Sequence, residues 1–252
     1  MDKRAAAKLA GTAEVSRASG RVRPPRARAK SGSKAAAPIV AAEPARVVRS
    51  RDPERTRAGI LAAATAEFSA RGFAGAGIDA IASGSGANRR MIYYYFKSKR
   101  RLWLAVLEAA YERARTAELR LDLDKLPPEA AMRALVTFTF DSFVGDRTFI
   151  NLLNSENLHQ ARHLKESERV RELHSPLIGM IQTILDRGVE ARVFRGGIDP
   201  AQLWISIAGI SYFYFSNIFT LSVILSRDLQ HKTEIETRRA HVADLILQSI
   251  RK

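Results

Sequence analysis

Apolar residues recur every three or four positions along most of the chain from residue 52 onward, which is the spacing of amphipathic helices. The first such segment begins with Asp52 and Pro53, a favourable cap and first-turn pair, and Gly72 ends it. Its apolar stripe is formed by Ile60, Leu61, Ala64 and Phe68. No alternating strand pattern follows, so the hydrophobic pattern predicts an all-α protein.

Two short helices are predicted next, joined by a glycine-containing turn. The first begins at about Ile78, with Ile78, Ile81 and Ala82 facing inward, and stops at the SGSG segment. Asn88 is a natural N-cap for the second, in which Ile92 and Phe96 are four residues apart and share the core face. Ser98 can cap a fourth helix. This arrangement predicts a helix-turn-helix braced by longer helices.

The segment NRRMIYYYFKSK at 88–99 is the candidate reading element. Three consecutive tyrosines cannot all face one core, because successive helical residues point about 100° apart. Arginine, tyrosine and methionine suit contacts with base edges, whereas flanking cations suit phosphates. The predicted base-reading residues are Arg89, Arg90, Met91, Tyr93 and Tyr94, and the predicted phosphate-binding residues are Tyr95, Lys97 and Lys99. The alternative is that these rings belong to a three-helix core.

The charge distribution favours a polyanion as partner. The formal net charge is +15, of which residues 1–50 carry +9 (12 Lys/Arg against 3 Asp/Glu) and residues 51–101 carry +6 (10 against 4). Residues 102–252 hold 19 charges of each sign. Because the basic excess lies in the first 101 residues, we expect a disordered basic tail at 1–50, a DNA-binding domain at 51–101 and a neutral second domain at 102–252.

The sequence from Ile60 to Glu108 resembles the TetR family of transcriptional regulators. The resemblance is carried by ILAAATAEFSARGF and by GIDAIASGSGANRRMIYYYFKSKRRLWLAVLE, with glycine and aromatic positions at the family's spacing. One departure is Gly77, where the family usually carries a threonine that contacts phosphate. The resemblance implies a ligand-responsive regulator, a repressor, that binds a palindromic operator as a homodimer.

The second half continues as helices and predicts a ligand-binding and dimerisation bundle. Residues 200–226 carry no charge and are long enough to span a bilayer, so a membrane-anchored interaction protein is one alternative. Polar residues along this stretch, among them Gln202, Ser211 and Asn217, and the lack of a clear positive-inside asymmetry argue against a membrane. In a TetR-like protein this helix and the last one would form the dimer's four-helix bundle.

Residues 154–176 and 193–217 also resemble the pyrimidine-responsive Rut regulator subgroup. This resemblance implies a small polar effector, with a nucleobase or related catabolite as the narrower expectation. Buried polar groups would orient such a ligand between aromatic walls. The predicted ligand-binding residues are Asn154, Asn157, His159, Ser175, Trp204, Tyr212, Phe213 and Asn217.

Metal-binding and enzymatic alternatives have less support. Glu156, His159 and His163 could share one helical face, but HQARH lacks the glutamate of a zinc protease. The sequence contains no cysteine, no GxSxG elbow and no phosphate-binding glycine loop. We therefore expect a cytoplasmic regulator with no catalytic residues, no metal and no cofactor.

Overall fold

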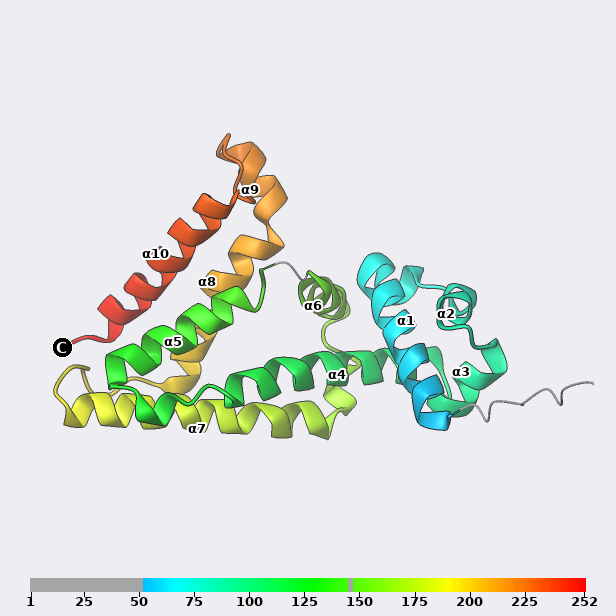
Figure 1. The fold of residues 1–252 in the computed structure, drawn as a ribbon, viewed down its shortest axis with the longest axis horizontal. Helices are drawn as coiled ribbons and strands as arrows, with labels where there is room; N and C mark the ends of the chain where they lie inside the picture. Colours follow the sequence, from blue (N-terminus) through cyan, green and yellow to red (C-terminus); the bar gives the residue numbers. More distant parts are fainter. Residues whose placement is uncertain (1–51, 145–146) are drawn as a thin grey trace, which may run out of the picture. The chain divides into compact units, whose positions relative to one another are not determined.

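The computed structural model describes residues 52–144 and 147–252. Within these ranges the regular secondary structure is helical, apart from one isolated β-bridge. The described residues lie in one compact unit, shown in Figure 1. The all-α prediction is confirmed, and the predicted basic tail at 1–50 falls outside the described residues. The α-helices are α1 (Pro53–Gly75), α2 (Ile78–Ser85), α3 (Arg89–Phe96), α4 (Lys99–Leu119), α5 (Pro128–Asp141), α6 (Thr148–Leu158), α7 (Glu168–Glu190), α8 (Pro200–Ser216), α9 (Ile218–Ile224) and α10 (Lys232–Ile250), with short 3₁₀ turns at Leu123–Lys125 and Leu164–Glu166.

Helices α1 to α4 pack around one apolar cluster, as the helical periodicity predicts. Asp52 caps α1 by accepting from the amide of Glu54 at 3.0 Å, and Gly72 interrupts the helix with a φ of 66°. A left-handed residue cannot continue an α-helix, so the regular part of α1 ends where the glycine predicts. The side chains fully buried in this cluster include Ile60, Ala64, Phe68, Ile81, Ile92, Leu102 and Trp103, whereas Leu61, Ile78 and Ala82 are only half-buried.

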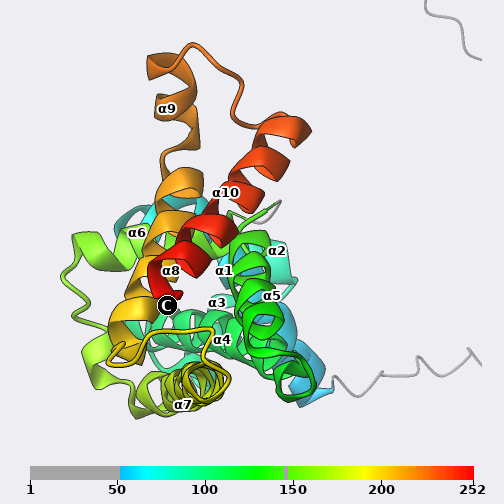
Figure 2. The ribbon, with the colours of Figure 1, turned by 90° about the vertical axis from the view of Figure 1, so that its left-hand side faces the viewer.

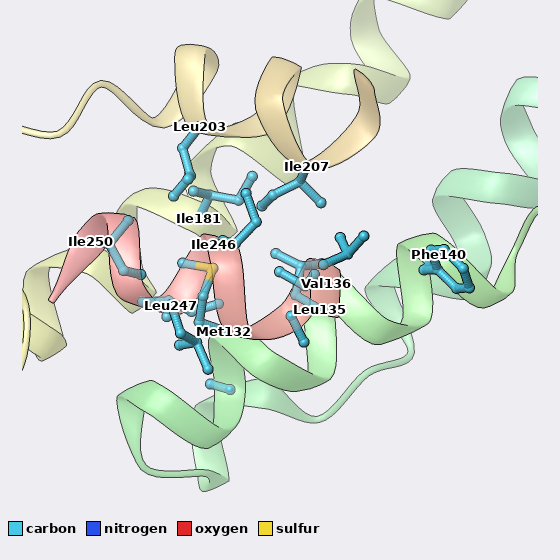
Figure 3. Close-up of a cluster of buried hydrophobic side chains, with 14 of the residues drawn as sticks. Met132, Leu135, Val136, Phe140, Ile181, Leu203, Ile207, Ile246, Leu247 and Ile250 are labelled. Atoms are coloured by element: carbon cyan, nitrogen blue, oxygen red, sulfur yellow. The ribbon is translucent and has the colours of Figure 1, made fainter. Parts of the chain in front are cut away.

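A second apolar cluster joins α5, α7, α8 and α10 (Figure 2). Figure 3 shows how Met132 and Leu135 of α5 meet Ile181 of α7, Ile207 of α8 and Ile246 of α10. Each of these helices buries one apolar stripe against the others. This packing positions α8 and α10 side by side at one edge of the unit.

The expectation of a continuous uncharged helix over residues 200–226 is wrong. Helix α8 ends at Ser216, and α9 leaves Asn217 at an angle of 69°. The Asn217 amide nitrogen donates to the carbonyl of Phe213 at 3.0 Å and to Ser216 Oγ at 2.8 Å, which satisfies groups at the helix end. Within 52–144 and 147–252, no single helix meets the length and hydropathy expected of a membrane span.

Two helices connect the clusters. Helix α4 contributes side chains from Leu102 to Ala110 to the first cluster and packs against α7 with its later turns. Helix α6 packs on α1 and also on α8. The predicted domain boundary between residues 101 and 102 therefore lies at the first turn of a helix that runs through both parts.

Candidate DNA-reading surface and effector cavity

The helix-turn-helix is formed by α2, a tight turn and α3. Gly86 ends α2 in the left-handed conformation with a φ of 66°, as a sharp turn between two short helices requires. Asn88 then caps α3, with its side chain accepting from the amide of Met91 at 2.9 Å. Ile92 and Phe96 are buried, so the opposite face of α3 is free to contact a partner.

The predicted base-reading residues lie on that face. Arg89 and Arg90 are exposed, Tyr94 is 70% exposed and Tyr93 is 41% exposed. The structure does not place these two tyrosine rings in the core, in contrast to the alternative considered above. Arg89 Nε lies 3.4 Å from Asp79 on α2, which orients the guanidinium on the surface. Met91 and Tyr95 are half-buried and pack against the first cluster, so only part of each side chain reaches the surface.

The two predicted phosphate-binding lysines have different surroundings. Lys97 is exposed, and its ammonium donates to the carbonyl of Tyr94 at 2.9 Å above the Tyr94 ring. The ammonium of Lys99 instead donates to the carbonyls of Ala76 at 2.5 Å and Ala74 at 3.3 Å. Lys99 thereby satisfies carbonyls at the end of α1, in addition to its predicted phosphate contact.

Gly77 occupies the position before α2 where a threonine was expected from the resemblance. Its amide donates to Glu67 Oε1 at 3.0 Å, which ties the start of α2 to α1, but the first-turn amides of α2 receive no side-chain cap. Glu67 Oε1 also lies 3.4 Å from Arg71 Nε, so this carboxylate is already paired with a cation.

A cavity of about 570 Å³ lies between α4, α5, α6 and α8, which is a suitable size for a small metabolite. Three predicted ligand residues line it: Asn157, Trp204 and Tyr212. Its aromatic walls also include Tyr111, Phe143 and Phe149. The cavity therefore brings together three of the eight residues predicted to bind a ligand, and aromatic side chains line several of its sides.

The cavity contains a buried ion pair that the sequence analysis missed. Arg115 Nη1 and Glu118 Oε2, both on α4, lie 2.6 Å apart, and the two residues are 5% and 3% exposed. Within the described residues, Arg115 Nε and the hydroxyl of Thr139 have no hydrogen-bond partner. Burial lowers the pKa of Arg115 and raises that of Glu118 to about 7, although the opposite charge of Arg115 limits the latter shift. In the sequence, Arg115 and Glu118 are simply an oppositely charged pair three residues apart on a helix, and such a pair usually lies on a solvated face.

The remaining predicted ligand residues do not line this cavity. Phe213 lines a separate groove of about 420 Å³ between α8, α9 and α10. Asn217 satisfies the end of α8, and His159 Nδ1 lies 2.7 Å from the carbonyl of Ser155. Asn154 is exposed, and its Oδ1 accepts a hydrogen bond from the hydroxyl of Tyr212, which itself lines the cavity. The side chain of Ser175 lies outside the described residues.

Helix α6 links the cavity to the DNA-binding half. Glu156, which is 1% exposed, accepts from Trp103 Nε1 at 2.8 Å, from the His163 ring at 2.8 Å and from the amides of His163 and Leu164. Its neighbour Ser155 accepts from the amide of Phe73, just after α1 is interrupted, at 3.2 Å. Side chains of α6 are therefore hydrogen-bonded to both α1 and α4.

These contacts also bear on the metal alternative. The Glu156 carboxylate and the His163 Nδ1–H bond each other, and the His159 ring faces a backbone carbonyl. Among residues 52–144 and 147–252, no cluster of three or more histidine and carboxylate groups has the geometry of a metal site.

Comparisons with known proteins agree with this geometry. A model described as "Bacterial regulatory proteins, tetR family" matches residues 60–106, and one described as "Tetracyclin repressor-like, C-terminal domain" matches residues 128–246. The HTH-type transcriptional repressor NicS of Pseudomonas putida is 39% identical over 205 residues, which cover 81% of this chain and 97% of NicS.

Similar folds occur among solved structures. The transcriptional regulator SCO4942 from Streptomyces coelicolor superposes with a TM-score of 0.58 at 23% identity, covering 77% of this chain and 98% of that one. AibR in complex with isovaleryl coenzyme A and operator DNA gives a TM-score of 0.58 at 15% identity, covering 76% and 97%. At these identities the likeness concerns the fold alone.

Proposed function

The chain belongs to the TetR family of transcriptional regulators, and we propose that it is a homodimeric repressor that releases its operator when a small polar effector enters the α4–α8 cavity. The observation that carries this proposal is the single unit formed by an exposed reading helix and a metabolite-sized cavity, connected through α6. Family membership makes the chain a DNA-binding regulator rather than an enzyme. We place it in the cytoplasm, where the operator and its effector meet.

The exposed face of α3 supports sequence reading in a major groove. Arg89 and Arg90 near its N-terminus suit bidentate contacts with guanine, and Tyr93 and Tyr94 offer ring faces and hydroxyls to bases. Lys97 beyond the helix end suits a phosphate. In this division of labour the arginines and tyrosines set base preference and the lysine sets affinity.

Arg89→Ala and Tyr94→Ala are each expected to weaken binding to the preferred DNA sequence by about 5- to 150-fold, which corresponds to about 1–3 kcal/mol for a lost base contact. Binding to random DNA should change much less. Lys97→Gln removes one positive charge but keeps a long polar side chain. It should weaken binding to the preferred sequence and to random DNA alike, and reduce the slope of log affinity against log salt by about one unit. Fluorescence anisotropy across a salt series measures all three effects.

Arg113→Ala is the matched control. Arg113 is exposed on α4, several turns beyond the end of α3, so the variant loses the same charge away from the predicted base-reading face. It should leave base preference unchanged. Equal losses on specific and random DNA for Arg89→Ala, Tyr94→Ala and Lys97→Gln would contradict the division of roles.

The proposed dimer interface is the outer face of α8 and α10. Ile205, Gly209 and Phe213 are four residues apart along α8 and are all exposed, with Ile205 at 60% and Phe213 at 57%. Ile205 and Gly209 also line the α4–α8 cavity, so the proposed interface adjoins the cavity. Leu245 on α10 is 42% exposed, and Phe213 shares the 420 Å³ groove with His241 of α10. An apolar surface of this kind is expected to be covered, and a second copy would place two reading helices at the spacing of a palindrome.

The proposed coupling passes through α6. An effector that contacts Asn157 or Tyr212 in the cavity would shift α6, and the Ser155 and Glu156 contacts would carry this shift to α1 and α4. The two α3 helices of the dimer would then have one spacing with the effector bound and another without it. Only one of these spacings would fit successive major grooves. A pyrimidine is the narrower proposal for the effector, and it rests on the Rut resemblance.

A further inference from the structure

The cavity's most unusual feature is a charged pair that is buried but incompletely hydrogen-bonded. Arg115 and Glu118 are 5% and 3% exposed, and their ion pair joins Arg115 Nη1 to Glu118 Oε2. Arg115 Nε and Thr139 Oγ1 have no hydrogen-bond partner among the described residues. Leaving buried polar groups without partners is unfavourable, and more so where they are charged. Polar groups that are left unsatisfied at a cavity wall are those that a ligand can satisfy.

The surroundings of the pair define the ligand's chemistry. The guanidinium carbon of Arg115 lies 5.0 Å from the centre of the Trp204 ring, and the ring of Tyr111 on the same helix also lines the cavity. A guanidinium with spare N–H groups binds a carboxylate in preference to a neutral oxygen. Aromatic walls on several sides suit a flat ring. The hydroxyl of Thr139 can donate to or accept from the same ligand.

Resting on the proposed function, we infer that the effector is a planar organic acid whose carboxylate takes the place of Glu118 as the partner of Arg115, while Glu118 takes up a proton from solvent. Two carboxylates cannot both stay ionised beside one buried guanidinium, because their repulsion is little screened at such a site. The net charge of the occupied cavity is then the same as that of the empty one.

The other titratable groups of the cavity do not compete for this role. Glu156 on α6 has its pKa lowered, since four hydrogen bonds outweigh the opposing effect of burial, so it stays ionised. Burial raises the pKa of Tyr111 on α4 and of Tyr212 on α8, so both keep their protons. Among the described lining residues, the polar side chains of α5 and its C-cap are the hydroxyls of Thr139 and Ser142. Glu118, with a pKa of about 7, is the group positioned to exchange a proton.

The test uses calorimetric titration of the full-length protein with two pairs of probes that differ in the carboxylate. Benzoate is compared with benzamide, and orotate, which is uracil bearing a carboxylate, is compared with uracil. We expect each acid to bind at least tenfold more tightly than its neutral partner. Affinity for the acids should fall about tenfold between pH 7.5 and 8.5, because binding requires protonation of a group whose pKa is about 7.

Proton uptake is measured directly by titrating at pH 8 in phosphate and in Tris, whose ionisation enthalpies differ. About one proton per bound acid is expected for the unmodified protein. The variant Glu118→Gln keeps the shape of the side chain but cannot titrate, so it should bind the acids without proton uptake and with little dependence on pH. Thermal unfolding of this variant checks that the fold is retained.

Neutral probes that bind as well as the acids would overturn the inference, as would failure of both acids to bind or a pH-independent affinity of the unmodified protein. The proposed function is judged separately, by operator binding. Release of the operator by uracil without proton uptake would support that function and refute this inference. An acid that binds with proton uptake but leaves operator affinity unchanged would support the exchange of carboxylates at Arg115 and would refute the cavity's role as the effector site.

Discussion

Replacement of Glu156 by alanine is expected to lower the free energy of unfolding by about 3–5 kcal/mol. The substitution leaves the Trp103 indole, the His163 ring and two backbone amides without their acceptor at a site that is almost fully buried. Urea unfolding followed by circular dichroism measures this loss. Glu156→Gln keeps one acceptor oxygen and should cost less, about 1–3 kcal/mol.

Glu172→Ala is the control for Glu156, because Glu172 is exposed on α7 and its loss should change the stability by less than about 0.5 kcal/mol. The Glu156 contribution also has a defined pH dependence. Its folded-state pKa is lowered, so the stabilisation is present above the ordinary glutamate pKa and is lost as pH falls through the folded-state value. An alanine variant as stable as the unmodified protein at pH 7 would refute the role assigned to this network.

Phe213→Glu is expected to abolish the dimer at micromolar concentration and to weaken operator binding by about 100-fold or more, that is by about 3 kcal/mol. Because the proposed interface has two-fold symmetry, the variant would bury two unpaired carboxylates in an apolar surface, one from each protomer. A monomer would then contact one half-site only. Sedimentation velocity measures the association state, and anisotropy with the inverted repeat measures binding.

Val189→Glu is the matched control for Phe213, because Val189 is 42% exposed near the end of α7 and makes the same apolar-to-acid change outside the α8–α10 face. This variant should remain dimeric. If Phe213→Glu also remained dimeric, the interface would have to lie elsewhere.

The fold could be predicted where local signals and tertiary packing agree. Asn88 and Ser98 were recognised as caps from residue type alone, and their side chains accept from the amides of Met91 and Arg101. The spacing of Ile92 and Phe96 indicated the buried face of α3 correctly. The break at Asn217 could not be predicted, because the uncharged residues on both sides of it suit one continuous helix.

The residues that line the α4–α8 cavity could be predicted less completely than the exposed face of α3. Arg115 and Glu118 have the spacing of a solvated pair, and only the packing of α5 and α8 against α4 buries them. Tyr212 and Phe213, neighbours in the aromatic run YFYF at 212–215, were predicted to line one pocket. Successive helical side chains diverge by about 100°, so Tyr212 faces the cavity whereas Phe213 faces the neighbouring groove.

Selection of genomic fragments on the purified protein at about 150 mM salt, followed by sequencing, tests the central claim most directly, because non-specific electrostatic binding is weakened at this ionic strength. We predict recovery of fragments that share an inverted repeat, as two reading helices related by a two-fold axis require. Repeating the selection with Arg89→Ala should lose that repeat while retaining general affinity. Recovery of unrelated fragments by the unmodified protein would contradict the claim that α3 reads a palindromic operator.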